Sequence, residues 1–269
     1  MRPISIPASI RQHLQSNSVL LGNVQNIRER FKRLQQGTPE ISVVIPAYNE
    51  EENILRTLSS LSCTTSQRSL EFIVVDNNSR DATASLVKAV GITCIHEPRQ
   101  GIAAARNTGL RAARGKLIIN ADADTIYPPA WIDEMVRPLE RSATAVCYGR
   151  FSFIPVGNTN RFVYFFYEYA ADMLRYFNKF FREEAVNVYG FNSSFRRDQG
   201  LEVDGFDHPP QASEDGWLAL KLRNKGFGKL HYVTNIRALV WTTDRRNQID
   251  GGLWKALGKK AKRIFLGKR

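Results

Sequence analysis

The chain has 269 residues, of which 43% are hydrophobic and 24% are charged, a balance that excludes a largely disordered protein. Its net charge is +12, but seven basic residues and no acidic residue fall within positions 255–269, so the rest of the chain is only mildly basic and no nucleic-acid partner is expected. The cysteines Cys63, Cys94 and Cys147 show no CxxC spacing, and their odd number argues against a disulfide framework.

An amphipathic helix is expected near the start of the chain, because apolar residues recur at steps of four and three from Leu20 to Leu34. Gly37 and Pro39 would end this helix. We therefore interpret residues 1–38 as a helical extension, for which packing on the main domain is favoured over a dimer contact.

Strands and helices then alternate along the chain. Short apolar runs predict strands at residues 41–45, 72–75, 92–95 and 117–119. Helices are expected between them at residues 51–61, 82–90 and 101–113. This alternation predicts an α/β fold with a mostly parallel central sheet and helices on both faces. Ligands bind such sheets beyond the carboxyl ends of the strands, where residues 46–50, 76–79 and 122–124 are expected to meet.

The pattern changes near residue 145. Strands are expected at residues 146–153, 230–233 and 238–241, and a strand or loop at residues 186–195. Helices are expected at residues 162–181 and 213–225. No apolar signal region occurs in residues 3–20, and the apolar stretch that begins at Arg161 and runs to residue 181 is interrupted by four further charged side chains, so we expect neither a signal peptide nor a membrane span. Because the cysteines also show no disulfide pattern, we expect the protein in a reducing compartment such as the cytoplasm.

Asp122 and Asp124 lie one residue apart, directly after the strand expected at residues 117–119. Two uncompensated carboxylates at a strand end repel each other, which makes a hard divalent cation a natural partner. Such a cation could bridge the phosphates of a nucleotide diphosphate. The alternative is a solvated turn in which the acids cap the next helix.

Five blocks in order resemble glycosyltransferase family 2. They are residues 43–51, residues 74–83, residues 101–115, residues 122–124, and an acceptor-side block of residues 205–207 and 213–215 followed by Leu218, Leu222 and Gly226. The order and spacing fit from about residue 41 to residue 230. The resemblance implies the GT-A fold, a nucleotide-diphosphate sugar donor and an inverting transfer to an acceptor hydroxyl.

The resemblance also implies a nucleotide site formed by Pro46, Ala47, Tyr48, Glu50, Asp76, Asn77, Arg106 and Asp122. Tyr48 would stack near the base, and Asp76 would bind the base or the ribose. Asn77 stands where many relatives have a second Asp, and Asn can donate as well as accept. A UDP-sugar is therefore favoured, and GDP- and dTDP-sugars stay open.

By the same resemblance, Asp124 and Asp122 would bind Mg²⁺ or Mn²⁺. Asp215 would be the general base, with Glu214 positioning it, at a helix start where the N–H groups and the helix dipole favour ionised carboxylates. The alternative is an acidic pair that only stabilises this helix. Arg245 and Arg246 could clamp the diphosphate where many relatives carry a His, although paired arginines often form a solvated face.

The expected domains are the extension at residues 1–38, a GT-A domain at residues 39–250 and a basic amphipathic tail at residues 251–269. The donor half of the GT-A domain would cover about residues 39–126, and the acceptor half about residues 127–250. A carbohydrate or lipid-linked acceptor is expected. The ten aromatic residues of the helix at 162–181 are assigned mainly to core packing, with one face for the acceptor or a membrane. Residues 253–269 could contact an anionic membrane at its inner face.

Two other functions agree less well with the sequence. A sugar nucleotidyltransferase would need a Gly-rich loop with Arg or Lys after the first strand, and residues 46–52 contain none of these. A non-catalytic basic binding protein is suggested only by the net charge, and the intact acidic blocks argue against it.

Overall fold

The computed structural model describes residues 1–156 and 159–245. Within these residues the strands form a seven-stranded sheet of order β3-β2-β1-β4-β8-β6-β9 and a three-stranded sheet of order β5-β10-β7. The strands are β1 Ile41–Ala47, β2 Leu70–Asp76, β3 Thr93–His96, β4 Leu117–Asn120, β5 Thr125–Ile126, β6 Thr144–Gly149, β7 Phe151–Ile154, β8 Ser193–Arg196, β9 Lys229–Val233 and β10 Val240–Thr243.

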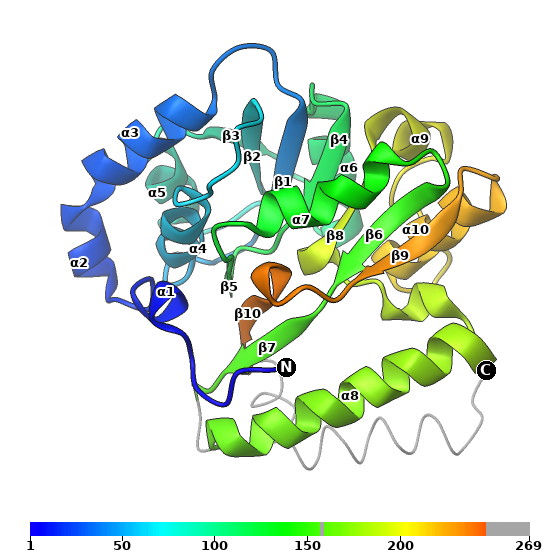
Figure 1. Ribbon diagram of the computed structural model, residues 1–269. Coiled ribbons are helices and arrows are strands. Elements are labelled where there is room, and N and C mark those ends of the chain that lie inside the picture. Colours follow the sequence, from blue (N-terminus) through cyan, green and yellow to red (C-terminus); the bar gives the residue numbers. More distant parts are fainter. Residues whose placement is uncertain (157–158, 246–269) are drawn as a thin grey trace.

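Helices cover the sheet and extend below it (Figure 1). The α-helices are α1 Ala8–Arg11, α2 Asn17–Gly22, α3 Val24–Leu34, α4 Ile54–Leu61, α5 Thr83–Ala89, α6 Ile102–Ala112, α7 Trp131–Val136, α8 Arg161–Phe181, α9 Arg197–Glu202 and α10 Glu214–Asn224. Four short 3₁₀ turns among the described residues are η1 Arg137–Glu140, η2 Glu184–Asn187, η3 Gly190–Asn192 and η4 Ile236–Ala238.

The first four strands of the large sheet are parallel, as the alternating pattern predicts. Strand β1 pairs in parallel with β2 on one side and β4 on the other, and β3 continues the parallel set beside β2. Strand β8 is antiparallel to both β4 and β6. Val43 and Ile45 pack in one hydrophobic core with α3, α4 and α7, whereas Val44 faces the core formed with α6, α9 and α10. The predicted α/β fold with helices on both faces is confirmed.

Two elements expected to be continuous are interrupted. The helix expected from Leu20 to Leu34 breaks at Asn23, whose side-chain amide donates to the Val19 carbonyl, because Asn competes for backbone hydrogen bonds. The strand expected at residues 146–153 divides at Arg150 into β6 and β7, which belong to different sheets. The Arg150 carbonyl accepts hydrogen bonds from Asn192 Nδ2 and from Val240 N, so it no longer bonds within the large sheet.

Helix α8 differs most from expectation. Its buried residues are Tyr164, Glu168 and Arg175. Seven of its ten aromatic residues are exposed, so the assignment of most of them to core packing is wrong. Among the described residues, no helix is long and apolar enough to cross a membrane. The tail at residues 251–269 lies outside the described part of the chain, and its membrane contact stays a prediction.

Candidate active site

The candidate site lies beyond the carboxyl ends of three neighbouring parallel strands, β2, β1 and β4 (Figure 1). The loop after β1 begins at Tyr48, the loop after β2 at Asn77 and the loop after β4 at Ala121. Because β1 lies between β2 and β4, these loops are neighbours in space. The strands consist mainly of buried apolar residues, and the polar residues of the candidate site lie at or just beyond their carboxyl ends.

The loops after β1 and β2 are tied together by hydrogen bonds. Asn49 N donates to Ser79 Oγ at 3.0 Å, and Asn49 Oδ1 accepts from Arg80 N at 2.9 Å. Glu50 N donates to Thr83 Oγ1 at 2.8 Å. Asn49 has a positive φ of 52°, a conformation that Asn tolerates better than most residues. The fixed loop leaves Tyr48 exposed and Pro46 half-buried, whereas Ala47 is buried in the core.

Asp76 and Asn77, at the end of β2, differ in what they contact. The Asp76 carboxylate lies 3.4 Å from His96 Nδ1. The Asn77 amide donates to the carbonyls of Glu97 and Arg99, and its oxygen accepts from Gly101 N. Asn77 therefore holds the loop of residues 97–101 in place, and its expected contact with the nucleotide stays a prediction.

The loop that carries Asp122 and Asp124 is held by its backbone. Asp122 N donates to the hydroxyl of Tyr127 at 2.8 Å, and this hydroxyl donates to the Phe191 carbonyl at 3.1 Å. Thr57 Oγ1 donates to the Ala123 carbonyl at 2.8 Å. The side chains of Asp122 and Asp124 keep 30% and 23% of their surface exposed, so both carboxylates reach solvent from a fixed backbone.

Arg106 joins the Asp122 loop to the acceptor-side block. Its side chain is 1% exposed; Nη2 lies 2.9 Å from Asp122 Oδ1 and Nε lies 3.4 Å from Asp215 Oδ1. Nη1 donates to the Gly190 carbonyl at 3.2 Å. Arg106, which the resemblance assigns to the nucleotide, is thus buried between two carboxylates, one in the loop after β4 and one at the start of α10.

Asp215 is a buried carboxylate at the start of α10, where Ser213 caps the helix by accepting from Gly216 N. Burial raises the pKa of Asp215 to about 7; Arg106 opposes this change, and the charges of Glu214 and Asp122 add to it. Within the described part of the chain, Asp215 Oδ1 has no hydrogen-bond donor. A buried carboxylate that is half-ionised near neutral pH is suited to accept a proton.

Gly190 is a site residue that the sequence analysis did not identify. A Cβ atom at this position would lie 2.0 Å from Arg106 Nη2 and 2.5 Å from Asp215 Oδ1, so only glycine lets the backbone pass this closely. In the sequence its only signal is a glycine between two aromatic residues, Tyr189 and Phe191, which predicts no contact with Arg106.

Arg245, two residues after β10, reaches the acidic end of the site. Its Nη2 lies 2.5 Å from Glu50 Oε1 and 3.4 Å from Asp124 Oδ2. A cationic side chain thus lies where the carboxylates would attract a metal ion, and carboxylate oxygens are the ligands that Mg²⁺ and Mn²⁺ prefer. Arg246 lies outside the described residues.

No group of three or more His, Cys, Asp or Glu side chains within residues 1–156 and 159–245 is arranged to hold a metal ion. A divalent ion would therefore need Asp122 and Asp124 together with oxygen atoms from a ligand. The exposure of both carboxylates fits this sharing, because each can be reached from solvent.

Comparison with known proteins supports the first four sequence blocks, from residue 43 to residue 124. Residues 42–199 match the sequence profile described as "Glycosyl transferase family 2". The glycosyltransferase AglE of Haloferax volcanii is 32% identical over 129 residues, which are 45% of this chain and 42% of that protein. The undecaprenyl-phosphate 4-deoxy-4-formamido-L-arabinose transferase of Pseudomonas paraeruginosa is 36% identical over 112 residues, 38% of this chain and 32% of the relative.

Among solved structures, the mannosyltransferase PcManGT from Pyrobaculum calidifontis, in complex with GDP-Man and Mn²⁺, superposes with a TM-score of 0.55. The match covers 87% of this chain and 67% of that chain at 22% identity, a likeness that shows the GT-A fold. The chain spans less than half the length of both curated relatives.

Proposed function

The chain belongs to glycosyltransferase family 2, and from this premise we propose that it transfers a sugar from a nucleotide-diphosphate donor to an acceptor hydroxyl. In this proposal the acceptor oxygen attacks the anomeric carbon as the bond from that carbon to the diphosphate oxygen breaks. The proton of the hydroxyl passes to Asp215, and the nucleoside diphosphate leaves. A single in-line displacement inverts the anomeric configuration.

On the donor side, the exposed Tyr48 and the partly buried Glu50 are available beside the β1 loop for the nucleotide, and the buried Asp76 lies at the end of β2. Asp124 and Asp122 would hold Mg²⁺ or Mn²⁺, which neutralises charge on the diphosphate when bound. Arg245 already contacts Asp124 and Glu50 and can pair with phosphate oxygens through its planar guanidinium. The donor site would therefore combine two carboxylates with one arginine.

The observation that carries the proposal is the Arg106 bridge. It fixes Asp122, on the donor side, and Asp215, on the acceptor side, to the same buried guanidinium at 2.9 and 3.4 Å. A base must lie within reach of the proton that it removes while the donor is held beside it. One buried arginine that holds both carboxylates supplies this arrangement.

The resemblance to family 2 favours a UDP-sugar as the donor. A GDP-sugar is the second candidate, because the structurally similar PcManGT was solved with GDP-Man. A carbohydrate or a lipid-linked hydroxyl is the proposed acceptor. The name of the undecaprenyl-phosphate sugar transferase supports the lipid-linked class. We place the reaction in the cytoplasm or at the inner face of a membrane.

The proposal is tested by release of nucleoside diphosphate from UDP-glucose, UDP-GlcNAc and GDP-mannose with Mn²⁺, each with a polyprenyl-linked saccharide or a soluble glycoside as the acceptor that supplies the hydroxyl. Asp215→Asn should keep donor affinity, measured by titration calorimetry, but lose transfer by about 10²–10⁴-fold, because positioned proton transfer contributes that much. Asn keeps the shape of Asp, so folding should be preserved. Wild-type turnover by Asp215→Asn and by Glu214→Gln, with an acceptor that the wild type uses, would show that the acidic block is structural.

A further inference from the structure

The exposed side of α8 forms a continuous apolar surface. Met173 is 75% exposed, and its neighbours along the helix follow steps of three and four residues. We call the aromatic face the residues Phe162, Phe166, Tyr169, Met173, Leu174, Tyr176, Phe177, Phe180 and Phe181. At about 1.5 Å per residue, a helix of 21 residues extends this face over about 31 Å. Large exposed apolar patches mark interaction sites.

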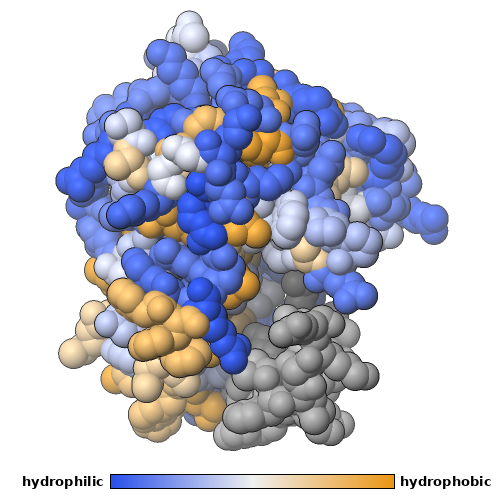
Figure 2. Space-filling model, turned by 90° about the vertical axis from the view of Figure 1, so that its right-hand side faces the viewer, coloured by the Kyte–Doolittle hydropathy of each residue, from blue (hydrophilic) through white to orange (hydrophobic). Residues whose placement is uncertain are grey.

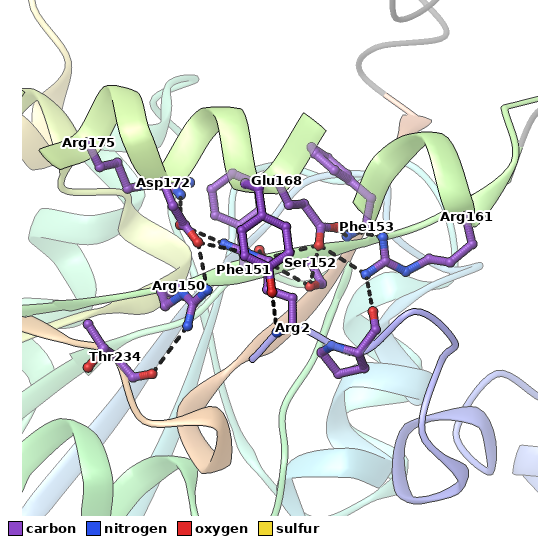
Figure 3. A network of polar contacts seen from close by, with 12 residues as sticks. Arg2, Arg150, Phe151, Ser152, Phe153, Arg161, Glu168, Asp172, Arg175 and Thr234 are labelled. Carbon is purple, nitrogen blue, oxygen red and sulfur yellow. Dashed lines mark hydrogen bonds and ion pairs between the residues drawn. The ribbon is translucent and has the colours of Figure 1, made fainter. Parts of the chain in front are cut away.

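The acidic residues of α8 lie on its opposite side. Figure 3 shows Glu168 and Asp172 turned towards Arg2 beneath the helix. Glu168 also accepts from Arg161 and from Ser152 Oγ, and Asp172 is paired with Arg150 at 2.6 Å. Burial would raise the pKa of Asp172, but its contacts with Arg2 and Arg150 hold it at about 2. The aromatic face therefore contains no carboxylate.

Basic residues lie at the C-terminal end of the face. Lys179 and Arg182 are exposed there. The next acids along the chain are already paired, Glu183 with Arg223 and Glu184 with Lys179 and Tyr148. Figure 2 shows apolar side chains gathered at the lower edge of the molecule, in the region of this end of α8. The surface is thus apolar along its length and not acidic at its end.

We propose that the aromatic face of α8 docks on the surface of an anionic lipid bilayer. A helix with one apolar face and a charged opposite face lies in the plane of the interface, and aromatic rings are suited to that depth. The arginines that neutralise Glu168 and Asp172 remove the charges that an acidic lipid surface would repel. Arg182, which is exposed at the end of the face, favours anionic headgroups.

The position of α8 connects this surface to the candidate active site. Asn178 Nδ2 donates to Asn187 Oδ1 at 3.0 Å, and Asn187 Nδ2 donates to the Arg175 carbonyl at 2.9 Å, so η2 is fixed to α8. Three residues further on, the Gly190 carbonyl accepts from Arg106. A bilayer on the aromatic face would therefore lie on the acceptor side of the site, where a lipid-linked hydroxyl could enter. Docking itself requires neither donor nor metal and does not depend on the proposed function.

The experiment uses the full chain without donor. It is incubated with vesicles of phosphatidylcholine alone or with vesicles in which about 30 mol% of the lipid is phosphatidylglycerol, so that the two compositions differ in surface charge. The variant Phe166→Ser/Met173→Ser removes two exposed apolar side chains from the face. The matched control is Val19→Ser/Leu21→Ser, which removes two exposed apolar side chains from the α2 region. Co-sedimentation should show at least tenfold weaker binding of the α8 variant to anionic vesicles, about 1.4 kcal/mol, and unchanged binding of the control.

Three results would overturn this proposal. The α8 variant could bind anionic vesicles as well as the wild type, or the control could lose binding equally. Sedimentation velocity without lipid could show a wild-type dimer that the α8 variant dissociates, which would make the face a contact between copies. The α8 variant could melt at a clearly lower temperature than the control without lipid, which would show that the chain itself covers the face. Transfer to a soluble acceptor should persist in the α8 variant, so a failure here leaves the proposed function intact.

Discussion

The rate of sugar transfer should rise with pH as Asp215 loses its proton. With a pKa of about 7, a single titrating carboxylate is ionised to about 9% at pH 6, about 50% at pH 7 and about 91% at pH 8. If Asp215 is the base, kcat/KM should therefore rise about tenfold between pH 6 and pH 8. An ordinary exposed Asp, with a pKa of about 3.9, would give a flat profile over this range.

The perturbation that tests this assignment is Glu214→Gln. The negative charge of Glu214 raises the pKa of Asp215, so its removal should move the rising limb of the profile to lower pH and raise the relative rate at pH 6. Glu202→Gln is the matched control, because it removes the same charge from an exposed position on α9 that pairs with Lys225.

The assay is kcat/KM for nucleoside diphosphate release from about pH 5.5 to pH 8.5, a range that brackets the pKa, with transfer checked by product mass. A limb that does not move in Glu214→Gln, or that moves equally in Glu202→Gln, would refute the electrostatic reasoning. If Glu214→Gln abolishes transfer while Asp215→Asn does not, the two carboxylates exchange roles. A product that retains the anomeric configuration would require a different mechanism.

Three further predictions follow from the same contacts. Asp124→Ala should weaken Mn²⁺-dependent binding of UDP at least tenfold, about 1.4 kcal/mol, without changing the melting temperature, because this partly exposed side chain adds little packing; calorimetry showing unchanged affinity would contradict the metal assignment. Gly190→Ala should destabilise the fold by about 1–3 kcal/mol in urea unfolding and lower kcat, whereas Gly22→Ala, where a Cβ meets no atom within 4 Å, should do neither. The folded-state pKa of Asp215 lies above its unfolded value, so the wild type loses stability as pH rises from about 4 to about 7, and the melting temperature of Asp215→Asn relative to wild type should increase over that range. A constant difference would show that the pKa is not raised.

The parts of the fold that could be predicted from the sequence are those set by local patterns. The apolar run of β1 is closed by Pro46 and that of β2 by Asp76, and these patterns predict buried parallel strands followed by loops at the ligand-binding edge of the sheet. The break at Arg150 could not be predicted in this way. The break depends on which groups donate hydrogen bonds to the Arg150 carbonyl. The donors, Asn192 and Val240, are distant from Arg150 in sequence.

Helix α8 shows why composition does not predict burial. Its aromatic residues are typical of a hydrophobic core, but the side of a helix that becomes buried is the side that the rest of the chain contacts. For α8 those partners are arginines: Arg2 comes from the first residues of the chain, and Arg150 from the break between β6 and β7. Because the buried side is fixed by ion pairs with Glu168 and Asp172, the apolar side is left facing outward. No periodicity within residues 161–181 contains that information.

The sequence predicted the individual residues of the candidate site but not the contacts between them. Asp122, Asp215 and Arg106 were each identified by the block in which they occur, yet their contact depends on the Arg106 side chain of α6 reaching both the loop after β4 and the start of α10. That packing has a cost, because Arg106 Nε and Asp215 Oδ1 are buried without a hydrogen-bond partner among the described residues. A buried acceptor left unbonded costs about 1–3 kcal/mol. Ion pairing at 3.4 Å offsets this cost only in part, since the pKa of Asp215 remains raised. Such a carboxylate adds no stability to the fold, and the proposed role in accepting a proton would account for its presence at this position.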